Sequence, residues 1–191
     1  MKRFAVIILA ALLLAAAGCD PIPGYSNDTA GPQDGGYYDG RIGDTLHTNW
    51  FDFCVNSVSA EFEYGGYTAE NGYFLIIANI TVKNTFGELL PMSRDDFQVQ
   101  WGGGDNDFGY GIEESEMPVE YTLRRGQSVT QDVVYEIPVY NDGEYSISYL
   151  EYYENGEYGD VFFIYFEEDM LELGALGIDT QGSGFRFLAK S

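Results

Sequence analysis

The sequence predicts an all-β protein, an antiparallel β-sandwich built from about six to eight short strands. Between residues 43 and 167, short apolar runs rich in valine, isoleucine and aromatic residues alternate with segments rich in glycine, asparagine and aspartate. Within the longer runs, apolar residues recur at every second position, which is the period of a strand with one buried face. No stretch of this region has the apolar period of a long helix.

The expected strands follow from these runs in chain order. They span residues 50–58, 73–83, 97–101, 128–137, 144–153 and 160–166, and a weaker strand is expected at 119–123. The second strand alternates most clearly, and its core-facing side is expected to consist of Phe74, Ile76, Ala78, Ile80 and Val82. Two further core stripes are expected, formed by Val129, Val133, Tyr135 and Ile137 and by Tyr145, Ile147 and Tyr149.

Turn residues separate the strands. Asn-Gly pairs at 71–72 and 155–156 supply the positive φ that tight hairpin turns require. Asn84 stands at the end of a predicted strand, where its side-chain amide can turn the chain. The segment from Ser93 to Phe97 is interpreted as a polar turn that delivers one aromatic side chain into the core.

The start of the chain has the pattern of an export signal. Lys2 and Arg3 precede an unbroken apolar run over residues 4–17, which is shorter than the about 20 apolar residues of a membrane-spanning helix. Residues 16–19, Ala-Ala-Gly-Cys, resemble a bacterial lipobox. The resemblance implies cleavage before Cys19 and a diacylglyceryl group on its sulfur, and two acyl chains suffice for stable attachment. Cleavage after the alanines as a simple secreted protein stays open.

Four segments are therefore expected. Residues 1–18 form the signal peptide, 19–41 the lipidated cysteine and a disordered tether, 42–167 the sandwich and 168–191 a C-terminal tail. The tether is rich in glycine, proline, aspartate and tyrosine and contains little that could form a core. The tail is expected either to fray or to dock on the sandwich.

The charge of the chain excludes several classes of partner. The chain contains 31 acidic and 9 basic residues, a net charge of −22. Removal of residues 1–18 takes away Lys2 and Arg3 and no acidic residue, which leaves −24. Such a charge repels nucleic acids and anionic lipid headgroups. It suits a solvated surface, the binding of divalent cations or the selection of a partner.

No catalytic motif is present, and we expect no enzymatic activity. The chain lacks the G-x-S-x-G, H-E-x-x-H, C-x-x-C and phosphate-loop patterns. Its single histidine, His47, is expected at the surface, and no pattern links it to Cys54. With Cys19 assigned to the lipid, Cys54 is expected to be a buried free thiol that packs as a small hydrophobe.

Several segments, in their order and spacing, resemble a known family. They are IGDT at 42–45, ITVKNT at 80–85, LPMSRDDF at 90–97, LRRGQSV at 123–129 and VYEIP at 134–138. Together they are similar to the telokin-like, immunoprotective-extracellular family of immunoglobulin-like domains of unknown function, which is common in lipoproteins of Gram-positive bacteria. The resemblance covers about residues 42–167. It implies an immunoglobulin-like sandwich on the extracellular face of a cell membrane, and it brings no shared catalytic residues.

Two candidate binding sites stand out. The loop over residues 102–120 combines glycines with carboxylates, which are hard oxygen donors, and calcium takes six to eight such oxygens. The spacing does not match an EF-hand. The candidate calcium ligands are Asp105, Asp107, Glu113, Glu114 and Glu116.

The second candidate site is aromatic. The chain contains 16 tyrosines, many of them near predicted turns. Tyrosine offers a flat apolar face and a polar tip, which suits contact with a protein or a sugar. Tyr152 and Tyr153 are adjacent in a predicted strand and therefore point to opposite faces. These two residues and Tyr110 are the candidate contact residues.

The favoured interpretation is a lipid-anchored, extracellular binding module. It would be attached to the membrane through Cys19, would need no cofactor, and would bind an unknown extracellular protein or envelope component. The alternatives are a calcium-dependent envelope protein that uses the 102–120 loop, and then a carbohydrate-binding protein or a hydrolase.

The calcium alternative generates a direct test. If the loop binds calcium, millimolar calcium should raise the melting temperature, because a ligand that binds only the folded state stabilises it. Replacing the first two acids, Asp105→Asn with Asp107→Asn, should abolish the rise. Thermal unfolding followed by circular dichroism measures both effects, and an unchanged melting temperature of the parent protein removes the calcium site.

Overall fold

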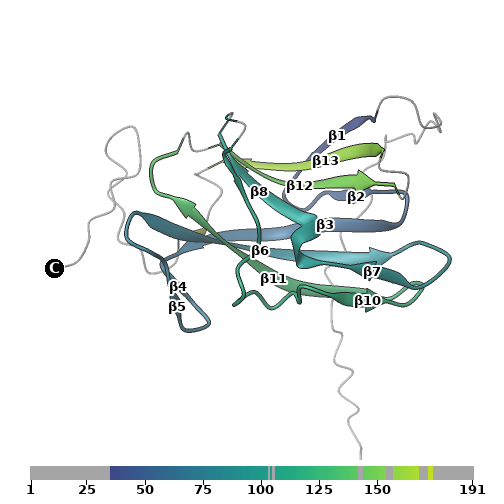
Figure 1. The fold of residues 1–191 in the computed structure, drawn as a ribbon, viewed down its shortest axis with the longest axis horizontal. Coiled ribbons are helices and arrows are strands. Elements are labelled where there is room, and N and C mark those ends of the chain that lie inside the picture. The colour runs from purple at the N-terminus through teal and green to yellow at the C-terminus, as the bar shows by residue number, and fades with distance from the viewer. Residues whose placement is uncertain are drawn as a thin grey trace, which may run out of the picture.

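The strands of this protein form two sheets packed face to face, the sandwich that the sequence predicts (Figure 1). The computed structural model describes residues 35–102, 104, 106–141, 144–153, 157–167 and 172–173. The first sheet, called sheet A, has the strand order β1-β13-β12-β8-β9. These strands are β1 (Tyr37–Arg41), β8 (Phe97–Trp101), β9 (Phe108–Gly109), β12 (Glu144–Tyr152) and β13 (Tyr158–Glu167).

The second sheet, sheet B, has the order β11-β6-β3-β14, with β2 also paired to β3. Its strands are β2 (Thr45–His47), β3 (Phe51–Glu61), β6 (Tyr73–Asn84), β11 (Ser128–Pro138) and β14 (Glu172–Leu173). Two small antiparallel pairs lie outside the main sheets, β4 (Glu63–Tyr64) with β5 (Tyr67–Thr68), and β7 (Leu90–Met92) with β10 (Tyr121–Leu123). The one helical element described is a 3₁₀ turn, η1 (Arg94–Asp96). None of the described residues form an apolar helix long enough to span a membrane.

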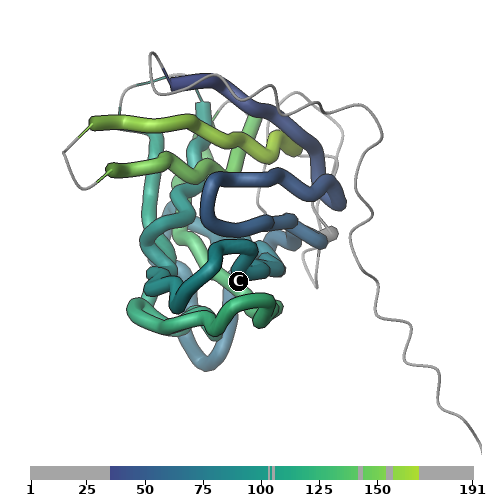
Figure 2. Tube along the Cα trace, turned by 90° about the vertical axis from the view of Figure 1, so that its right-hand side faces the viewer, coloured from purple at the N-terminus to yellow at the C-terminus, as the bar shows by residue number. Residues whose placement is uncertain are grey.

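The expected strands are confirmed, most of them to within one to three residues at each end. The strand expected at 119–123 is shorter, because only Tyr121–Leu123 pair, as β10. One boundary differs from the prediction. The tether was expected to reach residue 41, but Tyr37–Arg41 pair with β13 in parallel and form an edge strand of sheet A (Figure 2). Residues 1–34 lie outside the described residues, as does the C-terminal tail apart from β14, which pairs with β3.

Alternation along the strands determines the core. All five inward residues expected on β6 belong to the main hydrophobic cluster, together with Val133, Tyr135 and Ile137 of β11 and Tyr145, Ile147 and Tyr149 of β12. Val129 packs against this cluster and is only partly buried. Period two therefore selects the core face correctly on each of these strands.

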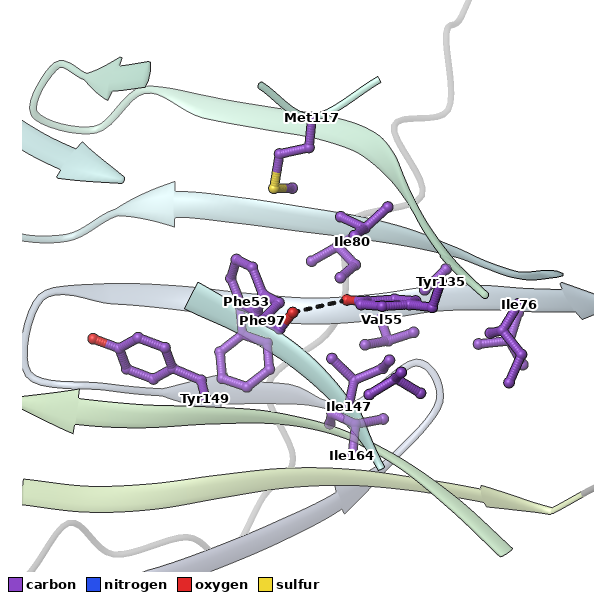
Figure 3. Packing of buried hydrophobic residues seen from close by; sticks show 14 of the residues in the cluster. Phe53, Val55, Ile76, Ile80, Phe97, Met117, Tyr135, Ile147, Tyr149 and Ile164 are labelled. Carbon is purple, nitrogen blue, oxygen red and sulfur yellow. Dashed lines mark hydrogen bonds between the residues drawn. The ribbon is translucent and has the colours of Figure 1, made fainter. Parts of the chain in front are cut away.

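Aromatic rings join the two sheets at the centre of this core (Figure 3). Phe51 of β3 lies with its ring centroid 4.7 Å from that of Tyr149 on β12, at 66° between the planes. Phe53 of β3 lies 5.5 Å from Phe97 of β8 and 6.3 Å from Phe162 of β13. The first and third of these pairs are edge to face and the second is tilted, and aromatic pairs in such arrangements contribute about 0.5–1.5 kcal/mol beyond the area that they bury.

A hydrogen bond also crosses between the sheets. The hydroxyl of Tyr135, on β11, donates to the backbone carbonyl of Phe97, on β8, at 3.2 Å (Figure 3). Burial raises the pKa of Tyr135 well above its usual range, because no solvent is available to stabilise the phenolate. The ring thus fills the core while its polar tip is satisfied.

The turn expected between Ser93 and Phe97 is present as a capped 3₁₀ turn. The Ser93 hydroxyl accepts a hydrogen bond from the Asp95 backbone, and the Asp96 carboxylate accepts one from the Ser93 backbone at 2.7 Å. This reciprocal arrangement is a capping box. It positions Phe97, which is fully buried at the start of β8.

Asn84 turns the chain at the end of β6, as predicted, and also ties three segments together. Its side-chain nitrogen donates to the carbonyls of Glu88 and Leu123, both at 2.9 Å, and its side-chain oxygen accepts from the Phe86 backbone at 2.7 Å. The residue is completely buried. Its amide therefore satisfies backbone groups that would otherwise be buried without partners.

We expect Asn84→Ala to destabilise the protein by about 3 kcal/mol, because it leaves buried backbone groups without hydrogen bonds. Urea unfolding followed by tryptophan fluorescence measures this change. Asn106→Ala, at an exposed position, is the matched control and should change the free energy of unfolding by less than about 0.5 kcal/mol. Equal effects of the two variants would contradict the role given to Asn84.

Candidate functional site

The outer faces of the two sheets differ in what covers them. On sheet B, Leu75, Ile77 and Val134 form a second hydrophobic cluster beneath partly buried residues that include Tyr64 and Tyr67 of the β4–β5 hairpin. The Tyr64 hydroxyl donates to Asp132 on β11 at 3.0 Å, and the Tyr67 hydroxyl donates to Glu136 at 3.1 Å. These two hydrogen bonds fix the β4–β5 hairpin against the outer face of sheet B.

The segment 110–117 protects the edge of sheet B beside the hairpin. Ile112 donates its backbone N–H to the carbonyl of Val134 at 2.8 Å, and Met117 places its side chain in the main core. The buried Arg94 donates from Nη1 to the carbonyl of Ile112 at 2.6 Å. A Cβ on Gly111 would lie 2.7 Å from Arg94 and Val133 side-chain atoms, so only glycine allows the segment to pass this closely.

The outer face of sheet A instead exposes a group of aromatic side chains, which we call the aromatic face. Side chains that are directly paired across strands lie on the same face, and the inward positions on β12 and β13 are occupied by core residues. The outward positions of the sheet and its edges hold the rings of Tyr37, Phe108, Tyr110, Tyr152, Tyr158, Phe163 and Tyr165.

These rings contact one another in three groups. Phe163 lies parallel to Tyr37 at 6.1 Å and close to parallel with Tyr165 at 5.6 Å between ring centroids. Tyr152 and Tyr158 meet edge to face at 4.7 Å. At the opposite edge of the sheet, Phe108 and Tyr110 meet edge to face at 6.0 Å.

Uncharged polar side chains lie between the aromatic groups. Ser146 and Ser148 on β12 are paired with Tyr165 and Phe163 on one side and with Gln100 and Gln98 on the other. The Gln98 amide also donates to the Tyr110 hydroxyl at 3.2 Å. The middle strands of the face therefore combine rings with amide groups and buried serine hydroxyls, and the charged side chains of Asp39 and Arg41 lie beside them on the edge strand β1.

The face is large enough for a macromolecular contact. Strands lie about 4.8 Å apart and rise about 3.3 Å per residue, so the five strands give a surface of roughly 20 Å across the strands and roughly 30 Å along β13. Tyr37, Tyr152 and Tyr158 are 78%, 56% and 65% exposed. Monomeric proteins rarely expose apolar patches of this extent unless the patches bind something.

The three tyrosines predicted as contact residues have different positions. Tyr110 and Tyr152 both belong to the aromatic face. Tyr153 points to the other side, as the sequence predicted for adjacent strand residues, and packs edge to face on Trp50 at 5.6 Å. Its hydroxyl donates to the buried Glu151 at 3.2 Å, so Tyr153 contributes to the end of the sandwich and not to the face.

The predicted calcium ligands are separated in the structure. Asp107 accepts a hydrogen bond from the Gly104 backbone in the turn before β9, whereas Glu116 lies beside β11, where it accepts one from the Asp132 backbone. Glu113 and Glu114 are exposed, and Asp105 lies outside the described residues. The described part of the chain contains no group of three or more histidine, cysteine or acidic residues placed to hold a metal ion.

The cysteine prediction needs one correction. Cys54 is buried in β3, as expected, but it is disulfide-bonded and is not a free thiol. The predicted lipid-attachment residue, Cys19, lies outside the described residues. His47 lies at the surface and contacts Asp52 at 2.7 Å, an antiparallel neighbour on β3.

The sequence did not predict most of the aromatic face. Tyr37 falls in a segment expected to be disordered, and residues 161–166 are apolar at every position, so alternation cannot tell their inward side from their outward side. Tyr158 stood out only as a tyrosine close to a turn. The register of β13 against β1 and β12 is the information that brings these rings together.

Comparison with known proteins defines the class. The model of the family described as a domain of unknown function (DUF4352) matches residues 40–158. The chain therefore belongs to this family of β-sandwich domains. No protein of curated function matches it.

Several solved structures are similar to this chain. One is described as a "putative lipoprotein" (ycdA) from Bacillus subtilis, with a TM-score of 0.49, 13% identity, 65% of this chain covered and 38% of that one. Another is an uncharacterized β-sandwich protein from Clostridium difficile 630, with a TM-score of 0.44, 11% identity, and 73% and 100% coverage. A third is the yjhA protein from Bacillus subtilis, with a TM-score of 0.43, 23% identity, and 57% and 80% coverage. The chain spans well under half of the first of these proteins.

The hairpin over sheet B generates a pH prediction. Burial and the hydrogen bond to Asp132 raise the pKa of Tyr64 from 10.0 to about 12. A tyrosine pKa that is higher in the folded state contributes stability that is complete below pH 10 and is lost as the pH rises through about 12. We therefore expect the free energy of unfolding to fall less steeply between pH 10 and 12 in Tyr64→Phe than in the parent protein, as measured by urea unfolding. Equal slopes would contradict this assignment.

Proposed function

We propose that this protein is a lipid-anchored, extracellular binding module that holds a protein or another envelope component through the aromatic face. The observation that carries the proposal is the position of that face, which gathers seven rings on one sheet, six of them exposed, while the other sheet is covered by the β4–β5 hairpin. Tyrosine is enriched at the centres of protein interfaces because it buries a large rigid ring and keeps a polar tip. The finer resemblance to telokin-like immunoglobulin domains agrees with such a role.

The anchor supports the same function. The N-terminal pattern at residues 1–19 resembles a lipoprotein signal, and the first strand of the aromatic face begins at Tyr37, a short distance along the chain from Cys19. A module attached in this way presents its partner at the membrane surface. The net charge of −22 disfavours direct contact of the domain with anionic headgroups.

The chemical state of the Cys19 sulfur tests the proposed anchor. The chain contains two cysteines, Cys19 and Cys54, and Cys54 is disulfide-bonded in the structure. A sulfur that carries a diacylglyceryl thioether cannot also form a disulfide. Mass spectrometry of protein extracted from membranes distinguishes the two forms, because a lipid on the N-terminal peptide supports the anchor, whereas a peptide that links the two cysteines contradicts it.

Cross-linking on living cells tests the binding function. We expect the tagged, full-length protein to capture one reproducible partner, and we expect capture to be lost when residues 42–167 are deleted and the anchor is kept. Tyr158→Ser with Tyr165→Ser should also abolish capture, because both rings leave the aromatic face. Tyr73→Ser, on sheet B, is the control and should capture normally.

Two results would overturn the proposal. One is the absence of any partner above the anchor-only protein. The other is normal capture by the Tyr158→Ser, Tyr165→Ser variant with its folded state verified by circular dichroism, since the face would then have no part in binding.

A further inference from the structure

We propose that the partner of the aromatic face is a protein surface that carries arginine or lysine side chains. This inference rests on the proposed function, since it names the chemistry of the partner at the same face. It comes from the charges at one end of the face, from the uncharged rings beside them and from the charge of the whole chain.

A pair of like charges lies at this end of the face. Glu144, the first residue of β12, is directly paired with Glu167, the last residue of β13. Both side chains are exposed and occupy outward positions in register with Ser146 and Tyr165. Like charges directly opposite each other on an antiparallel pair are destabilising. Among the described residues, neither carboxylate has an ion-pair partner.

The neighbouring strand does not neutralise this pair. Arg41, at the end of β1, is paired with Tyr165 and is the basic residue on this side of the face. Asp39, two positions earlier, is close enough for its charge to raise the pKa of Tyr165 further, in addition to the effect of burial. The side chains near Tyr165 are therefore three carboxylates and one guanidinium, those of Asp39, Glu144, Glu167 and Arg41. The net charge at this end of the face is negative.

A cation from a partner fits this arrangement in two ways. A guanidinium or ammonium group placed between Glu144 and Glu167 would convert their repulsion into two attractions. Tyr165 stacks on Phe163 with one face of its ring and can offer the other face to the same group, and cation–π contacts contribute about 0.5–2 kcal/mol as the site is desolvated. Arginine is enriched at the cores of protein interfaces for these reasons.

The charge of the whole chain favours the same class of partner. A net charge of −22 attracts and steers a basic protein towards the face and repels acidic proteins, anionic polymers and a second copy of this chain. The area of the face, roughly 600 Å² from the strand dimensions, is about three quarters of the 800 Å² that one partner buries in a standard interface. The face therefore has the size of an interface core with room for a charged rim.

Titration of the full-length, lipidated protein in neutral detergent tests the inference. Three probes are compared by calorimetry: a twelve-residue peptide that repeats Arg-Leu-Gly, its counterpart that repeats Glu-Leu-Gly, and the neutral glucan cellohexaose. We expect the arginine peptide alone to bind, with an affinity that falls as salt rises. Glu144→Gln with Glu167→Gln should weaken binding by about fivefold or more, and Tyr165→Ser by a similar factor.

Matched controls separate the face from general electrostatic attraction. Glu113→Gln with Glu114→Gln removes the same charge from exposed positions over sheet B, and Tyr73→Ser removes a tyrosine that is 38% exposed there, against 41% for Tyr165. Both controls should leave the affinity within about twofold of the parent protein. In addition, Glu144→Gln with Glu167→Gln should raise the melting temperature of the free protein, because it removes the like-charge pair.

Three outcomes would overturn the inference. Equal weakening by the two acid-to-amide variants would show attraction to net charge only. Binding of cellohexaose instead of the arginine peptide would assign the face to a neutral glycan. Binding of none of the probes would reject a cationic partner, while the cross-linking result on cells would still decide the proposed function separately.

Discussion

The structure depends on the packing of aromatic rings between its two sheets. Phe51 and Phe53 of β3 meet Phe97, Tyr149 and Phe162 from three strands of sheet A, with centroid distances of 4.7–6.3 Å. Because side chains alternate along a strand, fixing these rings inward forces the intervening residues outward. A slip of one residue in β13 would exchange Phe162 and Ile164 for Phe163 and Tyr165. The core and the aromatic face are therefore two consequences of one register.

Buried polar groups determine where the connecting segments run. Asn84 donates to the carbonyls of Glu88, in a loop, and of Leu123, at the end of β10, and the capping box at Ser93 sets the start of β8. Arg94, in the same turn, reaches across to the carbonyl of Ile112. Each of these bonds satisfies a group that would be costly to bury alone. Together they direct the 110–117 segment along sheet B, which explains why its acidic residues do not converge.

The result is a sandwich with two different outer faces. Sheet B is covered by the β4–β5 hairpin and bordered by the 110–117 segment, and its outer surface contains a polar network in which Asn56 binds Asn79 and Thr81, and Asn79 binds Asp132. Sheet A presents rings and uncharged polar groups, with Asp39 and Arg41 on its edge strand β1 and glutamates at one end. In a family of unknown function, this asymmetry is the physical basis for treating sheet A as the binding surface.

The sequence by itself determined the strands and the core, because period-two alternation on β6, β11 and β12 is a local property that survives in any arrangement of the sheets. It also determined the charge, the N-terminal lipoprotein pattern and the local turns at Asn84 and Ser93, but not the hydrogen bond from Asn84 to the carbonyl of Leu123, which is distant in the chain. Only the tertiary structure decided which tyrosines form a surface. Tyr37 and Phe163 are far apart in the chain and meet through the parallel pairing of β1 with β13. The fully apolar run at 161–166 has no alternation that would identify its outward side. The separation of Asp107 from Glu116 depends on the backbone hydrogen bonds that the 110–117 segment makes to β11, and no local sequence pattern encodes these bonds.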